Sequence, residues 1–600
     1  MKKYVKYFLI LLTICLLFTS CTSAGTPDKK STDSEYSQEV QNLEKLCKVW
    51  GYTKYTHPAF LLGERDWDEE LLKLIPVVSE AKAKKVNDIL HEWFVSLGEV
   101  DYGTSRKKTL PPEDELIVQA DTSWISDKKY LGKELTADLV QLDLSQKKEI
   151  PNIDRKKSPY YVTNYVSPFD PNDRRPVCFS NEKSYENIDY NDSAYCLLGL
   201  FRVWNAIEYC DPYLDVPDEN WHELLPESIE KMLGESGRKN YELTLYSLTA
   251  KLKDAHVNFF DHDLNHMPSL MEEFGEYGAP VFLNTVEGKL VVSEVLDNTS
   301  RALAVFDGIC PLQVGDVICK IEGKEIQDVI EHRKQYIAVP TGEKIINMLS
   351  GMLLRSHNEN FEVTVLREGK EETVTVTGQT IFMPTIAYAL VSHERLDGDI
   401  GLINPYVLQP SEIFSIMQEF QDTDGLILDF RQYPYGDPGS DAVSSKLAGY
   451  FIENSQPFAI RSDLLGTMPG TFKKTPLLSG GIPPGQSREG AYHYDKPVVV
   501  LINEQSQSAS ELSTMALRNG ERVTVMGENS SGGLGGMRYL PLPGGFLMSY
   551  SGIGFYTPDG EQVECVGIYP DIEVHPTIEG IKEGLDELLE AAVAYIREQK

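Results

Sequence analysis

One stretch of the chain, residues 497–536, most limits what it can fold into. It opens with the unbroken apolar run 498–502, which is typical of a strand buried on both faces of a parallel sheet. Apolar residues then recur at helical spacing from Leu512 onward, and Gly520 is a natural helix end. Ser508 therefore stands where a buried strand passes through a tight loop into a helix, and we expect an α/β core around it.

A serine at this place has part of what acyl transfer requires. The start of a helix leaves backbone N–H groups unpaired and carries the positive end of the helix dipole. An oxyanion needs such donors fixed in place before its charge develops. Serine is also a common helix cap, so Ser506, Ser508 and Ser510 could serve only to begin the helix.

The residues around Ser508 resemble the nucleophile region of the S41 serine peptidases. The resemblance lies in Ser-Ala-Ser-Glu at 508–511 after the apolar strand, and in the Gly-rich turn 532–536. This family includes C-terminal processing proteases, tricorn-type proteases and nisin resistance proteins. The resemblance implies that Ser508 is the nucleophile and that the N–H of Ala509 is one oxyanion donor.

The base must differ from that of the C-terminal processing branch, which carries a lysine in the Gly-rich turn. No lysine occurs here between Ser508 and Lys582. A serine is a poor nucleophile without an adjacent base. We therefore expect a histidine in this role.

His256 is the histidine whose context fits best. It lies in Asp-Ala-His at 254–256, and tricorn-type and nisin resistance proteins carry their histidine at a similar place. The resemblance implies that His256 takes the proton from Ser508 and returns it to the leaving amine. The alternative is a metal cluster formed by His256 with the acidic and histidine residues of 261–266, but their spacing matches no standard zinc signature. We expect no metal and no cofactor.

Three further residues complete the expected site. Glu564 stands where tricorn-type enzymes carry the glutamate of a Ser-His-Ser-Glu tetrad, although Ala255 replaces the linking serine. Glu511 is the other acidic candidate, with stabilisation of the helix N-terminus as its alternative role. Gln-Tyr-Pro-Tyr-Gly at 432–436 stands where the family places Asn-x-Gly-Gly, and this resemblance makes Gly436 the candidate for the second oxyanion donor.

The N-terminus and the net charge bear on location and partners. Residues 1–20 combine three lysines with a short apolar run, and small residues precede Cys21. This pattern resembles a bacterial lipobox, so we expect an extracytoplasmic protein that is lipid-anchored to a bacterial membrane through Cys21; a plain signal cleaved nearby is the alternative. The formal net charge of −34 excludes nucleic acid as a partner.

The rest of the chain indicates a multidomain α/β protein with duplicated N-terminal helical modules. Trp50 and the residues after it match Trp204 and its surroundings at an offset of about 154 residues.

Leu-Gln-Val-Gly-Asp at 312–316 resembles the core of a PDZ domain, which takes an extended peptide as an added strand. Residues 277–280 are the candidate groove for that peptide. The S41 resemblance implies a crotonase-like α/β catalytic core. The expected parts are a signal peptide 1–20, a tether 21–38, helical repeat 1 at 39–104, an extended linker 105–191, helical repeat 2 at 192–268, a PDZ-like domain 269–380, a catalytic domain 381–580 and an amphipathic C-terminal helix 581–600.

These observations predict a serine endopeptidase that cleaves peptides or unfolded proteins. Two other functions stay open on the same fold. One is a non-catalytic protein that binds peptides or lipophilic molecules, and the other is an esterase or amidase that acts on small molecules.

Overall fold

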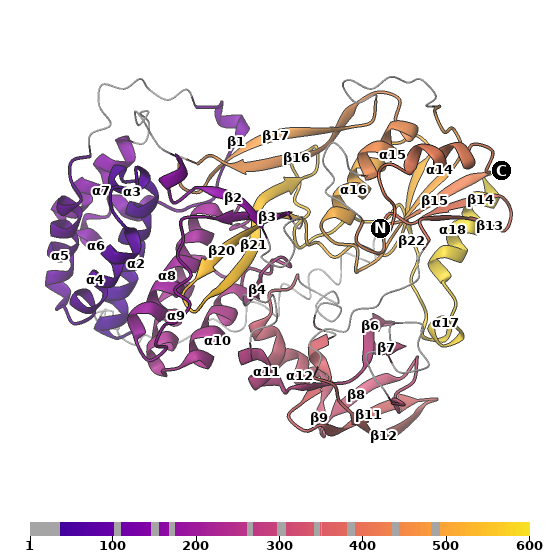
Figure 1. The fold of residues 1–600 in the computed structure, drawn as a ribbon, viewed down its shortest axis with the longest axis horizontal. Coiled ribbons are helices and arrows are strands. Elements are labelled where there is room, and N and C mark those ends of the chain that lie inside the picture. Colours follow the sequence, from indigo (N-terminus) through magenta and orange to yellow (C-terminus); the bar gives the residue numbers. More distant parts are fainter. Residues whose placement is uncertain are drawn as a thin grey trace, which may run out of the picture. The chain divides into compact units, whose positions relative to one another are not determined.

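A computed structural model describes residues 36–100, 110–145, 155–166, 174–260, 268–296, 308–340, 349, 351–380, 391–434, 443–466, 468–481 and 492–599 (Figure 1). Cys21, Gly436 and the segment 261–267 lie outside these residues. The expectations for the signal peptide, the lipid anchor, the second oxyanion donor and the alternative metal cluster therefore fall outside the described part. Among the described helices, none combines the length and the apolarity needed to cross a bilayer.

Two sets of helices form the N-terminal half. The first comprises α2 (Gln38–Thr56), α3 (Pro58–Leu61), α4 (Trp67–Ser79) and α5 (Ala83–Ser96), and the second comprises α8 (Ser193–Cys210), α9 (Trp221–Gly234) and α10 (Arg238–Ala250). Both sets contain the same indole contact, because Trp50 Nε1 donates to the carbonyl of Trp67 at 2.8 Å and Trp204 Nε1 donates to that of Trp221 at 3.2 Å. The residue before each acceptor, Asp66 or Asn220, caps the helix that follows with its side chain.

The segment between the two sets is not the extended linker that the sequence suggested. Its elements are η1 (Glu113–Glu115), β1 (Leu116–Val118), η2 (Ser123–Ser126), α6 (Lys128–Leu131), α7 (Lys133–Ser145), η3 (Arg155–Lys157), β2 (Val162–Val166) and β3 (Arg174–Phe179). The prediction was wrong for α7, a helix of 13 residues. Leu135, Leu139 and Leu142 follow helical spacing and are buried, so an apolar helix face was present within a strongly charged stretch.

An eight-stranded sheet joins this segment to the C-terminal half. Its order is β1-β17-β16-β21-β20-β3-β2, with β4 also paired to β21. The later members are β4 (Asn258–Phe260), β16 (Gln456–Leu464), β17 (Thr471–Ser479), β20 (Gly535–Leu542) and β21 (Phe546–Tyr556). The pairing of β4 with β21 sets the position of the turn that carries His256.

A second sheet occupies the middle of the chain, in the order β12-β11-β8-β7-β6, with β9 paired to β8. Its elements are α11 (Pro268–Phe274), β6 (Val281–Val286), β7 (Lys289–Val295), β8 (Val317–Ile321), β9 (Lys324–Glu325), α12 (Ile326–Arg333), η4 (Lys334–Tyr336), β11 (Asn360–Arg367) and β12 (Lys370–Thr377). Strand β5 (Tyr277–Gly278) pairs with β10 (Arg355–Ser356), and the N–H groups of Gly278 and Ala279 donate to the carbonyls of Gln379 and Leu354. These N–H groups are therefore not available to a peptide, and the expectation that residues 277–280 form the peptide-binding groove was wrong.

The third sheet, β13-β14-β15-β18-β19-β22, is parallel from β14 onward. Its strands are β13 (His393–Leu396), β14 (Ile400–Ile403), β15 (Gly425–Asp429), β18 (Val498–Ile502), β19 (Val523–Gly527) and β22 (Ile572–Glu573), and its helices are α14 (Ile413–Glu419), α15 (Val443–Phe451), α16 (Ala509–Leu517), α17 (Ile578–Glu583) and α18 (Glu587–Glu598). Val498, Val500 and Ile502 pack in one apolar core with residues of α14, α15 and α16. Val499 and Leu501 pack in another core with residues of α18. Both faces of β18 are therefore covered, as its unbroken apolar run predicts.

The C-terminal amphipathic helix is divided in two. Gly584 adopts φ +70° and ends α17, and Asp586 caps α18 by accepting a hydrogen bond from the N–H of Leu589. A left-handed glycine directly after a helix is a common helix end. The prediction of one continuous helix was wrong because this glycine stops the first part.

Candidate active site

Ser508 lies in the turn between β18 and α16, in a backbone conformation that non-glycine residues rarely adopt. Its φ is +53° and its ψ is −107°. Such a conformation costs about 1–3 kcal/mol and persists only where neighbouring contacts hold it. Here the N–H of Ser508 donates to the carbonyl of Gly533 and to Glu511 Oε2, both at 3.0 Å. The turn is strained and anchored, as in the strand–turn–helix elbows that present a nucleophilic serine.

Glu511 anchors this turn from within the protein. Its side chain is fully buried and accepts hydrogen bonds at Oε1 from the Ser530 hydroxyl at 2.6 Å and from the Gly532 N–H at 2.8 Å. Together with the bond from Ser508, these contacts tie the helix start to the Gly-rich turn. Glu511 therefore caps α16 and positions the turn, which is the alternative role that the sequence left open.

The start of α16 provides one candidate oxyanion donor. Ala509 is the first residue of the helix, and the structure records no hydrogen bond from its N–H to any other described residue. The Ser510 hydroxyl donates to the carbonyl of Gln432 at 3.1 Å, and the Ser506 hydroxyl donates to that of Phe430 at 3.0 Å. These bonds fix the chain after β15 beside the nucleophile turn, four residues before Gly436.

His256 lies in the turn that leads into β4 and is 5% exposed. Its Nδ1 lies 3.1 Å from Ser551 Oγ and 3.5 Å from Asp254 Oδ1. The backbone is fixed as well, because the His256 N–H donates to Asp254 Oδ1 at 2.8 Å and the His256 carbonyl accepts from the Ser549 hydroxyl at 2.6 Å. Strand β21 thus holds both the backbone and one ring nitrogen of this histidine.

Asp254 is the carboxylate nearest to the imidazole among the described residues. It is 3% exposed and accepts at Oδ2 from the Ser551 N–H at 2.6 Å and at Oδ1 from the Ser551 hydroxyl at 2.9 Å. Burial, the largest influence, acts to raise the pKa of Asp254. The hydrogen bond and charge of His256 and the N–H of Ser551 outweigh it and hold that pKa below its usual value.

The nucleophile turn and the histidine turn meet at Gly533. Its carbonyl accepts from the Ser508 N–H, while a Cβ placed on Gly533 would lie 2.8 Å from the Cβ of Ala255. Only a residue without a side chain allows this approach. The structure therefore brings Ser508 and His256, which are far apart in the sequence, to opposite sides of one glycine.

Glu564 forms no hydrogen bond to the imidazole among the described residues, so its support of His256, which Ala255 left open, stays a prediction. It is 1% exposed, and neither carboxyl oxygen has a hydrogen-bond partner among the described residues. Burial, followed by the charges of Asp254 and Glu511, raises the pKa of Glu564 well above its usual value. The raised pKa favours the neutral form of Glu564, and Asp254 with Ser551 lies next to His256 Nδ1.

Known proteins resemble this chain over part of its length. The model of peptidase family S41 matches residues 399–574. A carboxy-terminal-processing protease of Bartonella bacilliformis is 25% identical over 347 residues, which are 56% of this chain and 69% of that protein. A probable CtpA-like serine protease of Staphylococcus haemolyticus is 24% identical over 268 residues, and this chain spans about half of its length, 47%. The crystal structure of mature CPAF aligns with a TM-score of 0.50 at 14% identity, over 68% of this chain and 98% of that one, and shows a shared fold.

Residues 399–574 of this chain are a peptidase S41 domain.

The family assignment and the serine-type peptidase activity predicted from the sequence are thereby confirmed, as is a mixed α/β multidomain fold. The substrate of this S41 peptidase is a peptide or protein. Among the residues that the structure describes, no group of histidine, cysteine and acidic side chains is arranged to hold a metal ion.

Sequence reasoning missed two residues of the site, Asp254 and Ser551. Asp254 was within the Asp-Ala-His motif, and its position two residues before the histidine was the available signal. Ser549 and Ser551 alternate along β21 with the apolar residues of that strand, and buried serines on one strand face indicate polar partners there. No feature of the sequence assigned those partners to His256.

The contact at Gly533 gives a testable prediction. We expect Gly533→Ala to lower kcat about 10- to 100-fold, because the new methyl group meets Ala255 and Gln507 and forces the two turns apart by a few tenths of an ångström. The measurement is turnover of a peptide substrate, with Gly466→Ala as the control, since a Cβ on that exposed glycine contacts nothing. Wild-type turnover by Gly533→Ala would show that the two turns do not meet at this residue during catalysis.

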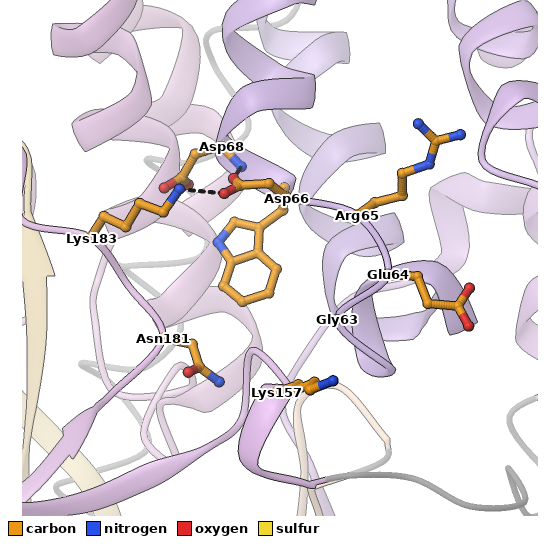
Figure 2. Close-up of a pocket in the computed structure, with 9 residues that line it drawn as sticks. Gly63, Glu64, Arg65, Asp66, Asp68, Lys157, Asn181 and Lys183 are labelled. Atoms are coloured by element: carbon orange, nitrogen blue, oxygen red, sulfur yellow. Dashed lines mark hydrogen bonds and ion pairs between the residues drawn. The ribbon is translucent and has the colours of Figure 1, made fainter.

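A cavity of about 280 Å³, lined by none of these site residues, lies at the N-terminus of α4 (Figure 2). In Figure 2 the ammonium group of Lys183 points towards the carboxylate of Asp66, with which it forms an ion pair. The cavity is lined by Gly63, Glu64, Arg65, Asp66, Trp67, Asp68, Lys157, Asn181 and Lys183. Among its described lining residues there is no hydroxyl nucleophile and no histidine, so this lining does not resemble a hydrolytic site.

Proposed function

We propose that this S41 peptidase cleaves peptides or unfolded proteins through an acyl-enzyme on Ser508, with His256 as general base. The observation that carries the proposal is the strained turn of Ser508, bonded to the same Gly533 that contacts the residue before His256. His256 Nε2 removes the proton of the Ser508 hydroxyl as the oxygen attacks the peptide carbonyl. The same nitrogen then gives that proton to the leaving amine, and water releases the acyl group by the reverse route.

The N–H of Ala509 holds the oxyanion in this mechanism, and Gly436 provides the second donor. The N–H of Ala509 supports the first assignment, because it has no hydrogen-bond acceptor among the described residues and lies at the positive end of a helix dipole. The bonds of Ser506 and Ser510 to the chain after β15 support the second, since they hold that chain beside the nucleophile.

Residues 269–380 act in this proposal as a PDZ-like module that delivers the peptide. Strand β6 ends the order of its sheet, and no described strand pairs with its outer edge, where an added strand would bind. The module also contacts the nucleophile turn, because Gln505 Nε2 donates to Asn284 Oδ1 at 3.2 Å. A cavity of about 550 Å³ lies between α10 and residues 334–340, close to the turn that carries His256.

Two further proposals concern the N-terminal half. The helical sets 39–104 and 192–268 are copies of one unit, which is supported by helix boundaries and indole hydrogen bonds that correspond at the same offset. The mature protein is extracytoplasmic and lipid-anchored through Cys21, which is supported by the sequence pattern of residues 1–21. Mass spectrometry of the membrane fraction tests the anchor, and a protein released from membranes without lipid on Cys21 contradicts it.

A fluorophosphonate probe tests the catalytic proposal. We expect the wild type to be labelled and Ser508→Ala to be unlabelled, while Ser415→Ala, a change at an exposed serine of α14, keeps full labelling. Cleavage of casein at a higher kcat/KM than that for a simple ester separates a peptidase from an esterase. Equal labelling of wild type and Ser508→Ala would support a binding protein on this fold.

A further inference from the structure

We propose that Ser551 and Asp254 form a relay that holds His256 in the one tautomer able to accept the proton of Ser508. The inference rests on the proposed function of Ser508 and His256 and adds two positioning residues to it. In this relay the acid that supports His256 is Asp254, two residues before it, and not Glu564, the acid expected from the sequence.

The direction of each hydrogen bond follows from the number of protons available. The Ser551 hydroxyl has one proton and lies 2.9 Å from Asp254 Oδ1. An ionised carboxylate can only accept, so Ser551 donates to Asp254. Ser551 Oγ must then accept from its other neighbour, His256 Nδ1, at 3.1 Å. Nδ1 therefore carries the imidazole proton, and Nε2 keeps the lone pair that a general base requires.

Asp254 is held in the ionised, accepting state by its surroundings. The Ser551 N–H donates to its second oxygen at 2.6 Å, and the His256 N–H donates to its first at 2.8 Å. These bonds, with the imidazole, keep the pKa of Asp254 below its usual value despite burial. The other titratable groups that act on Asp254 or lie beside it are Asp211, Tyr213, Tyr550 and Glu564. Burial raises the pKa of each of these four groups, which favours their neutral forms beside Asp254.

The local backbone leaves room for this relay. A Cβ on Gly535 would lie 2.1 Å from Ser551 Oγ, so the facing strand β20 needs glycine at that position. The Ser549 hydroxyl lies two residues earlier on β21 and bonds the carbonyl of His256 instead of its ring. Of the two buried serines, only Ser551 is placed to set the tautomer.

The relay requires no proton transfer to Asp254. When the bond from Ser508 Oγ to the substrate carbon forms, the Oγ proton moves to Nε2 and the imidazole becomes a cation. Its Nδ1–H continues to donate to Ser551, and Ser551 continues to donate to the Asp254 anion, which stabilises that cation. When the C–N bond of the substrate breaks, the Nε2 proton leaves with the amine.

The experiment compares four variants by the pH dependence of kcat and of fluorophosphonate labelling. We expect Asp254→Asn to lower kcat about 10³- to 10⁴-fold and Ser551→Ala about 10- to 100-fold, with KM changed less than about threefold. In both variants the acidic limb of the profile should move to lower pH, because the imidazolium loses its supporting anion or the link to it. Ser549→Ala is the matched serine control, and its acidic limb should stay at the wild-type pH.

Glu564→Gln separates the relay from its rival. If Glu564→Gln moves the acidic limb and Asp254→Asn does not, the supporting acid is Glu564 and the relay is overturned. Unchanged kcat and pH profile in both Ser551→Ala and Asp254→Asn would overturn it as well. If the wild type shows no Ser508-dependent labelling, the proposed function falls together with the relay, whereas labelling without these shifts overturns the relay alone.

A measurement on the wild type covers the case in which Asp254→Asn fails to fold. With ¹⁵N-labelled histidine, NMR at neutral pH should show one imidazole protonated at Nδ1 with a low-field proton that is absent from His256→Gln. Protonation of His256 at Nε2 instead would contradict the relay directly.

Discussion

Replacing His256 by alanine is expected to lower kcat by about 10⁴- to 10⁶-fold, to nearly the level of Ser508→Ala. The reason is that the two acids near the nucleophile turn in the described part of the chain are poorly suited as bases. Glu511 is occupied by hydrogen bonds within the turn, and burial raises the pKa of Glu564. The measurement is kcat on a peptide substrate under saturating conditions.

Because the two residues act as one unit, their losses should not add. The double variant Ser508→Ala/His256→Ala should be no slower than the slower single variant, within about threefold. KM should change little, since neither side chain contributes uniform binding energy. A His256→Ala enzyme that keeps a tenth of wild-type turnover would exclude His256 as the base.

Replacing Glu182 by glutamine is expected to destabilise the helical half by about 3–5 kcal/mol. Glu182 bonds Lys54 Nζ at 2.5 Å and lies 3.0 Å from Arg202 Nε, while Arg202 Nη2 lies 2.8 Å from Asp68 Oδ2. All four side chains are at most 2% exposed. They balance in charge, so loss of Glu182 leaves two buried cations facing one anion.

Tryptophan fluorescence during urea unfolding measures this effect selectively. All six tryptophans of the chain lie between Trp50 and Trp221, within the helical half and the segment between its two sets. The matched control is Lys183→Ala, which removes an ion pair next to the network in which the lysine is 52% exposed and should cost less than about 1 kcal/mol (Figure 2). A Glu182→Gln midpoint equal to that of Lys183→Ala would show that the buried network contributes no more than a surface pair.

Two further results should accompany this change. Adding Lys54→Met to Glu182→Gln should recover part of the loss, because the remaining Arg202 and Asp68 again balance in charge.

The pKa of Glu182 lies below its usual value, because the charges of Lys54 and Arg202 outweigh the effect of burial. A carboxyl with a lowered pKa stabilises the fold above the unfolded value of 4.5 and loses this contribution as the pH falls below it. The difference between wild type and Glu182→Gln should therefore shrink below about pH 4.5.

Local patterns predicted the parts of the fold that depend on neighbouring residues. The apolar run of β18 required cover on both faces, and α18 and the helices of the opposite face provide it. The same reasoning failed where one residue changed the outcome or where charge masked a pattern. Gly584 ended a helix that the apolar spacing alone would continue, and α7 formed within a segment whose charge suggested extended structure.

The candidate site shows the same division. Ser508 could be identified from the strand, loop and helix around it, because the geometry of such a turn depends on adjacent residues. The identity of the acid could not, since Ser551 lies 297 residues from Asp254 and reaches it only through the pairing of β21 with β4. The relation of Glu564 to His256 was inferred from resemblance, and the structure places Glu564 without a hydrogen bond to the ring.

The sequence by itself determined the resemblance of the catalytic part to S41 peptidases, the α/β core and the serine at the helix start, because each depends on a short run of neighbouring residues. The tertiary structure decided which histidine-carrying turn lies beside that of Ser508 and which side chains hold the imidazole of His256. Those choices depend on strand register and on the close approach allowed by Gly533, and a shift of one residue in β21 would turn Ser551 to the opposite face of the sheet.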